Sequence, residues 1–144
     1  MTIAQTTSFS VSEAPRALGR SVGAVLAGLL NVVVLSTLTD AVMHATQVFP
    51  PAGEVMSGGL FGLATAYRLI FGVLGGYVTA RLAPRAPLRH ALILGAIGFV
   101  LSCLGALATI GRGPEFGPMW YPLALVVTAL PCSWAGAKLW RPRA

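Results

Sequence analysis

The sequence predicts an all-α fold: an integral membrane, four-helix transmembrane bundle with both termini in the cytoplasm. Hydrophobic residues make up 56% of the chain and charged residues only 10%, whereas a soluble domain carries about 25% charged residues. Four apolar stretches are long enough to cross a bilayer. Basic residues gather at alternate ends of these stretches, and this pattern sets the orientation of a membrane protein.

The sequence indicates a single membrane domain, residues 17–140, between two short tails. Residues 1–16 are rich in Ser and Thr and lack an apolar helical face, which predicts a mobile cytoplasmic tail. Residues 141–144 form a second cytoplasmic tail. We expect the four spans at about residues 18–45, 60–82, 91–110 and 119–138.

The second half of the first span is more polar than the first half. It is uncharged from Ser21 to Thr39. Residues spaced by four or three positions lie on one face of a helix, and polar residues on such a face point into the bundle. The second half of the span carries a polar stripe of this kind: Ser36, Asp40, His44 and Gln47.

The second span contains a permanent charge. Its 23 residues from Leu60 to Leu82 reach about 34 Å, enough for the hydrocarbon core. Arg68 lies inside this span and cannot lose its proton. Because an Arg near a helix centre costs about 2.5–3.5 kcal/mol on insertion, the span depends on neighbouring helices.

The remaining two spans are uncharged in their interiors. The third runs for 20 residues from Ala91 to Ile110 without a charge. The fourth contains Pro131 well inside it. Because proline removes a backbone hydrogen bond, we expect a kink at this position.

The orientation follows from the distribution of Lys and Arg. Of the 10 basic residues, 8 lie in the N-terminal tail, the middle turn and the C-terminal end of the chain. The other two connections hold only Arg112, and Arg68 is embedded. Since basic residues mark cytoplasmic segments, both termini are expected in the cytoplasm.

A single embedded charge requires a partner. Asp40 lies about 7 Å below the outer end of its span and Arg68 about 12 Å below the outer end of the next. Side chains lean toward the N-terminus of their helix, so in antiparallel spans these two point toward each other. We therefore expect an Asp40–Arg68 ion pair, with His44 one turn above it.

Other charged residues fall on the same outer side. Glu54, Arg112 and Glu115 lie in the outer connections. With the ion pair and His44 they would line an outer vestibule that binds a solute. In the simpler interpretation, the pair only locks two helices and the loop charges are solvated.

Small residues indicate where helices approach each other closely. Gly72 and Gly76 form a GxxxG ridge in the second span, and Gly95 and Gly98 are candidates for helix contact in the third. These glycines are expected to pack helices within the chain, or against a second copy.

Several functional classes lack support in the sequence. We find no nucleophile–base set, no Gly-rich phosphate loop and no HExxH, so we expect no catalytic residues, no cofactor and no enzyme activity. Asp40 and His44 have a metal-ligand spacing without a fixed third ligand, so no metal is expected. The formal charge of +6 arises at span ends, where topology explains it, so nucleic acid is not an expected partner.

The sequence resembles small, functionally uncharacterised bacterial four-span membrane proteins. The resemblance rests on the TAYR…GG…AR spacing around Arg68 and on the WYP motif that begins at Trp120, and it covers residues 18–140. It implies a four-helix fold in the bacterial inner membrane and attaches no activity. Small multidrug exporters are less similar, because their essential carboxylate lies deep in span 1, whereas Asp40 lies near the outer end.

We therefore expect a structural or accessory protein of the inner membrane, organised by the Asp40–Arg68 pair. The alternative is a small oligomeric transporter or channel for a polar or anionic solute with an outward-facing site. The expected partners are the lipid bilayer and either a second copy or another membrane protein.

Overall fold

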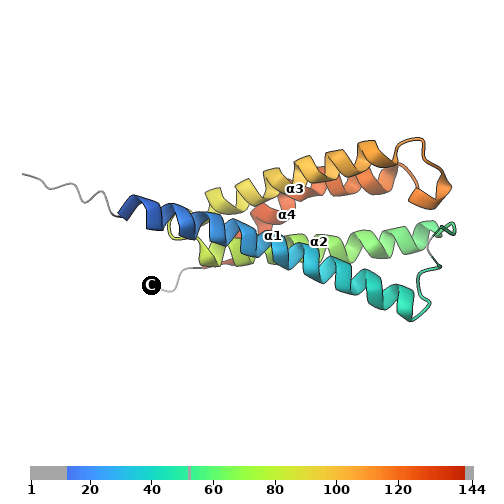
Figure 1. Cartoon of the computed structure of the whole chain (residues 1–144), viewed down its shortest axis with the longest axis horizontal. Coiled ribbons are helices and arrows are strands. Elements are labelled where there is room, and N and C mark those ends of the chain that lie inside the picture. The colour runs from blue at the N-terminus through green and yellow to red at the C-terminus, as the bar shows by residue number, and fades with distance from the viewer. Residues whose placement is uncertain (1–12, 52, 142–144) are drawn as a thin grey trace, which may run out of the picture.

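The computed structural model describes residues 13–51 and 53–141, which form four antiparallel helices (Figure 1). A short 3₁₀ helix η1 (Pro114–Phe116) lies in the last connection. All four long helices are sufficiently long and apolar to cross a membrane, which confirms the predicted all-α class with four membrane-spanning helices. Their bounds are α1 (Glu13–Ala45), α2 (Gly58–Leu82), α3 (Pro87–Thr109) and α4 (Trp120–Leu139).

The helices begin and end close to the predicted positions, with one clear difference. Helix α1 begins at Glu13, so residues 13–16 of the predicted tail are helical, while the apolar span within α1, Leu18–Ala45, has the predicted bounds. Residues 1–12 and 142–144 of the predicted tails lie outside the described residues. Gln47, the last member of the predicted polar stripe, follows the end of α1 and has a φ of 58°, so it does not share the helical face.

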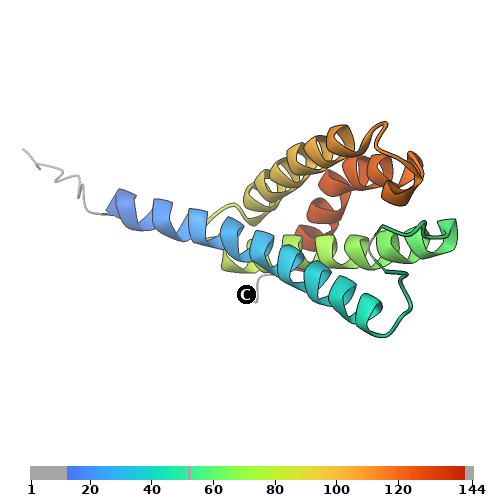
Figure 2. The ribbon, with the colours of Figure 1, turned by 45° about the vertical axis from the view of Figure 1, so that its right-hand side comes forward.

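The four helices form two hairpins, α1–α2 and α3–α4, whose backbones lie close together at one end and farther apart at the other, where Phe61 and Tyr121 still join α2 to α4. We call the end with Glu13 and Leu139 the terminal end, and the end with the α1–α2 and α3–α4 connections the loop end. The hairpins lie close together near the terminal end and diverge toward the loop end (Figures 1 and 2). Helix α1 packs mainly on α2, whereas α4 packs on both α2 and α3.

The interior of the bundle is built from small residues. The buried apolar set includes Ala24, Ala64, Ala80, Ala91 and Ala137. Large aliphatic side chains face outward instead; Leu107 and Val127 are 69% and 70% exposed. This arrangement suits a bilayer, in which lipid solvates the apolar exterior and helices associate by close packing of small residues.

Glycines allow the closest helix contacts. A Cβ added at Gly28 of α1 would lie 2.7 Å from the carbonyl oxygen of Gly75 of α2. A Cβ at Gly76 of α2 would lie 2.5 Å from the carbonyl oxygen of Ser133 of α4. Both contacts are with backbone, which has little freedom to move aside, so these interfaces require glycine.

The glycines singled out in the sequence lie against α4. Gly72 is next to Cys132, Gly76 and Gly95 are next to Ser133, and Gly98 is next to Ala129. The predicted ridge on α2 and the candidate glycines of α3 therefore pack helices of one chain.

Helix α4 packs against both α2 and α3. It bends part-way along (Figure 2), and Pro131 lies inside it. Because proline cannot donate the i→i−4 hydrogen bond and its ring displaces the preceding turn, a bend at this residue is expected. Beyond the bend, Ser133 lies against Gly76 of α2 and Gly95 of α3.

Substituting Gly76 by Ala tests the α2–α4 interface. The added Cβ meets the Ser133 backbone, so the free energy of unfolding should fall by about 1–3 kcal/mol, as in other overpacked cores. Gly62 of the same helix has open space at its Cβ position, and Gly62→Ala is the matched control, expected to be neutral or slightly stabilising. Equal melting temperatures for the two variants would contradict the assigned interface.

Candidate functional site

A closed network of three side chains joins α1 to α2. Nη2 of Arg68 donates to Oδ2 of Asp40 over 2.5 Å. Nη1 of Arg68 donates to the Tyr67 hydroxyl over 3.1 Å, and that hydroxyl donates to Oδ1 of Asp40. Both carboxylate oxygens and two guanidinium donors are therefore engaged. The structure thus brings Asp40 and Arg68 together as the ion pair predicted from the sequence.

The two charged residues meet although they lie at different depths. Asp40 is five residues before the end of α1, and Arg68 is ten residues after the start of α2, or about 7 and 15 Å from the loop end. The helices are antiparallel, so side chains that lean toward their own N-termini approach each other. The long Arg68 side chain covers the remaining difference in depth.

Aromatic rings from two helices surround the guanidinium. The Cζ atom of Arg68 lies 5.2 Å from the ring centroid of Tyr67 and 5.9 Å from that of Tyr121. Both distances are within the range of a cation–π interaction. Because Tyr121 belongs to α4, Arg68 also links the α1–α2 hairpin to the α3–α4 hairpin.

The ion pair is only partly buried. The side chains of Arg68 and Asp40 are 24% and 31% exposed, respectively, whereas Tyr67 is 8% exposed. The network therefore has a closed side at Tyr67 and an open side at the two charges. Two cavities account for this exposure.

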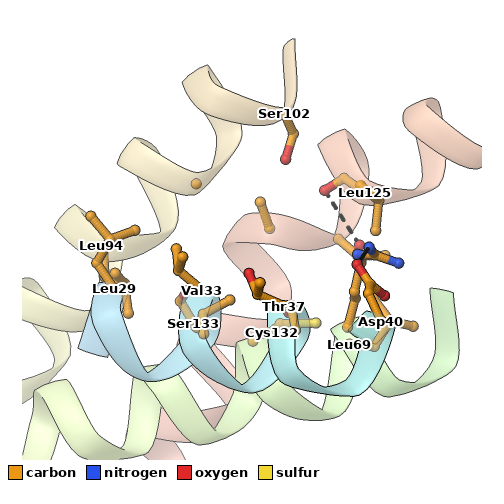
Figure 3. Close-up of a pocket in the computed structure, with 17 residues that line it drawn as sticks. Leu29, Val33, Thr37, Asp40, Leu69, Leu94, Ser102, Leu125, Cys132 and Ser133 are labelled. Atoms are coloured by element: carbon orange, nitrogen blue, oxygen red, sulfur yellow. Dashed lines mark hydrogen bonds and ion pairs between the residues drawn. The ribbon is translucent and has the colours of Figure 1, made fainter. Parts of the chain in front are cut away.

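The larger cavity, which we call the crevice, lies between the hairpins. Its volume is about 380 Å³, and residues of all four helices line it. Figure 3 shows Asp40 at one end and Leu29 and Leu94 at the other. Its surface is mainly apolar, with Ser36, Thr37 and Ser102 among the polar lining residues.

The smaller cavity, which we call the vestibule, lies at the loop end. Its volume is about 190 Å³. His44 on its wall donates from Nδ1 to the carbonyl oxygen of Pro50 over 3.0 Å, and its ring meets Phe49 edge-on at 5.5 Å. The ionisable residues of the wall are Asp40, His44, Glu54, Arg68 and Glu115.

Asp40 and Arg68 line both cavities. The ion pair is thus a shared wall between a polar space at the loop end and an apolar space deeper in the bundle. A molecule in either cavity would contact the same two charges.

The vestibule gathers most of the predicted site residues from distant parts of the chain. The structure brings Glu54 of the α1–α2 connection and Glu115 of η1 to the same cavity as Asp40, His44 and Arg68. Arg112 is exposed in the α3–α4 connection and is not part of this wall. Three carboxylates and one guanidinium give the vestibule a formal charge of −2 with His44 neutral.

Neither Tyr67 nor Tyr121 was among the site residues predicted from the sequence. A signal for Tyr67 was present: a tyrosine next to an embedded Arg carries a hydroxyl that needs a partner in the membrane. Tyr121 carried only the signal of an interfacial aromatic residue. Its contact with Arg68 depends on how α4 crosses α2, which a single sequence does not fix.

Metal binding finds no support in the described residues. Across residues 13–51 and 53–141, no three His, Cys, Asp or Glu side chains are grouped to hold a metal ion. Cys103 and Cys132 are both free thiols. The groups that the site presents to a ligand are charges, hydrogen-bonding groups and aromatic rings.

Comparison with known proteins gives no assignment. No protein-family model, curated protein or solved structure matches the chain. The function must therefore be argued from the site itself.

Proposed function

We propose that this chain is a multi-pass protein of the bacterial inner membrane, with both termini in the cytoplasm and the loop end outside. The distribution of basic residues supports this orientation, with 8 at the terminal end and Arg112 alone in the loop-end connections. Trp120 and Tyr121 at the start of α4 are typical of a membrane interface. The vestibule would then face the periplasm.

Labelling of single cysteines tests the orientation. Val55→Cys lies in the α1–α2 connection and Arg85→Cys in the α2–α3 turn, and both positions are exposed. A membrane-impermeant maleimide should label Val55→Cys in spheroplasts, and Arg85→Cys only after the membrane is permeabilised. The reverse pattern would contradict the orientation.

We infer that the protein is non-enzymatic and that its outer end binds a polar solute at the Asp40–Arg68 pair. The observation that carries this inference is the position of the pair on the walls of both cavities. Partial exposure spares the two charges part of the desolvation cost of a fully buried ion pair, and it leaves them accessible to a ligand. Here the guanidinium, which has five N–H donors, uses Nη1 and Nη2 within the described network and borders open space.

The charge of the vestibule narrows the solute class. The sequence-based alternative was a polar or anionic solute. A wall with a formal charge of −2 disfavours a simple anion and favours a solute that carries a positive group. A receptor could use such a site. A transporter could use it equally, with the network of Asp40, Tyr67 and Arg68 separating the vestibule from the crevice.

A second candidate function is that of an accessory subunit, organised by the same ion pair. The crevice between the diverging hairpins carries Ser36, Thr37 and Ser102. Small hydroxyl residues of this kind form hydrogen bonds between transmembrane helices. A helix of another membrane protein would then occupy the crevice.

Ligand-dependent thermal stability tests the solute-binding function. The purified protein is melted with a panel of small amines, anions and zwitterions, and Arg68→Gln and Arg112→Gln are compared with the wild type. A bound solute at 100 times its Kd adds about 2.7 kcal/mol to the free energy of unfolding. This stabilisation should be lost in folded Arg68→Gln protein and kept in Arg112→Gln, because Arg112 lies outside the vestibule wall.

Two results would reject solute binding. Either no solute class stabilises the wild type, or the stabilisation persists in Arg68→Gln. Purification of a stoichiometric membrane partner together with the first of these results would favour the accessory subunit.

A further inference from the structure

The vestibule and the crevice lie at different depths along the helix axes, with the vestibule nearer the loop end. The vestibule lies at the loop end, where the connections and η1 contribute its wall. The crevice extends from Asp40 toward Leu29 (Figure 3). These residues are 11 positions apart on α1, or about 16 Å along the helix axis. The site is therefore polar near the membrane surface and apolar toward its middle.

The polar part presents charges of both signs that are free to meet a ligand. Glu54 and Glu115 are exposed, and neither forms an ion pair with another described residue. Arg68 lies deeper than these two residues and shares its charge with Asp40. Aromatic rings complete the wall, with Phe61 and Tyr121 in contact at a centroid distance of 5.0 Å. Such a wall complements a head group with an anionic part below a cationic part.

The apolar part is reached from the lipid. Helices α2 and α4 stay in contact at the loop end through Phe61 and Tyr121, whereas the backbones of α1 and α3 diverge toward that end in both views (Figures 1 and 2). Residues of α1 and α3 line the crevice, and Val33 of α1 is 50% exposed. A hydrocarbon chain can therefore enter sideways while its head group stays at the membrane surface.

We propose that the vestibule and the crevice together bind one zwitterionic phospholipid of the outer leaflet. Its phosphate is placed against Arg68, its ammonium group against Glu54 and Glu115, and one acyl chain in the crevice. This assignment rests on the proposed solute-binding function and names its ligand. The volumes of the two cavities, about 380 and 190 Å³, together fall within the usual range of about 300–1,000 Å³ for a ligand pocket.

Charge complementarity separates this ligand from the other candidates. An anionic phospholipid brings a phosphate for Arg68 but no positive group for the two glutamates, whose carboxylates then repel it. A lipophilic cation meets the glutamates but places its charge beside Arg68. A partner helix fills the crevice and leaves the polar vestibule without a ligand.

Native mass spectrometry from detergent micelles tests the assignment. The protein is offered an equimolar mixture of phosphatidylethanolamine and phosphatidylglycerol with identical acyl chains. We expect wild type to retain the zwitterionic lipid about tenfold better, the effect of one charge-assisted hydrogen bond. The Glu54→Gln/Glu115→Gln variant should retain the two lipids equally.

A matched pair of tryptophan variants tests the place of the acyl chain. Leu125 lines the crevice, whereas Leu123 of the same helix faces outward and is 50% exposed. Leu125→Trp should lose most of the retained lipid, and Leu123→Trp should behave as wild type. Equal retention by these two variants, equal retention of the two lipids by wild type, or a protein subunit in place of lipid would each overturn the assignment.

Soluble glycerophosphoethanolamine separates failure of this assignment from failure of the proposed function. It carries the head group without acyl chains. If it raises the melting temperature while wild type shows no preference between the lipids, the vestibule binds a solute and the phospholipid assignment is wrong. If neither the head group nor the lipid binds, the assignment and the solute-binding function are both wrong.

Discussion

A permanent positive charge inside a membrane helix is the constraint on which the rest of this structure depends. Arg68 cannot be neutralised by losing its proton, and alone it costs about 2.5–3.5 kcal/mol near the centre of a span. Asp40 supplies the opposite charge and the Tyr67 hydroxyl bridges the two. Helix α1 is therefore tied to α2 at one defined register, and Tyr121 extends the contact to α4.

The remainder of the bundle is held by packing of small residues. Lipid tails are as apolar as leucine, so hydrophobic burial provides little force between membrane helices. Glycines and alanines provide instead the close contacts of α4 with α2 and α3. These contacts gather near the terminal end, while the ion pair acts nearer the loop end, where the hairpins diverge. The divergence leaves the crevice and the vestibule on either side of the same pair.

The sequence was most informative where local rules apply. Span length and hydropathy predicted the four helices, and the direction of side chains in antiparallel helices predicted the contact of Asp40 with Arg68. The start of α1 was missed because residues 13–16 are too polar to resemble a membrane span, although a helix can extend beyond the bilayer. By its spacing, Gln47 belonged to the predicted polar stripe of the first span, but it lies beyond the last turn of α1.

The parts of the site that were missed depend on tertiary arrangement. The contact of Tyr121 with Arg68 needs the path of α4, and the exclusion of Arg112 from the vestibule needs the conformation of the α3–α4 connection. Neither follows from spacing along the chain. The same applies to the separation of the hairpins, which decides that the ion pair borders open space rather than a packed core.

A double-mutant cycle on the ion pair tests the central claim most directly. The free energy of unfolding is measured for wild type, Asp40→Asn, Arg68→Gln and the double variant in one lipid or detergent. If the pair organises the bundle, the double variant should be less destabilised than the sum of the single variants, with a coupling of about 1–3 kcal/mol. Additivity to within about 0.5 kcal/mol would show that the two residues act independently and would contradict the account.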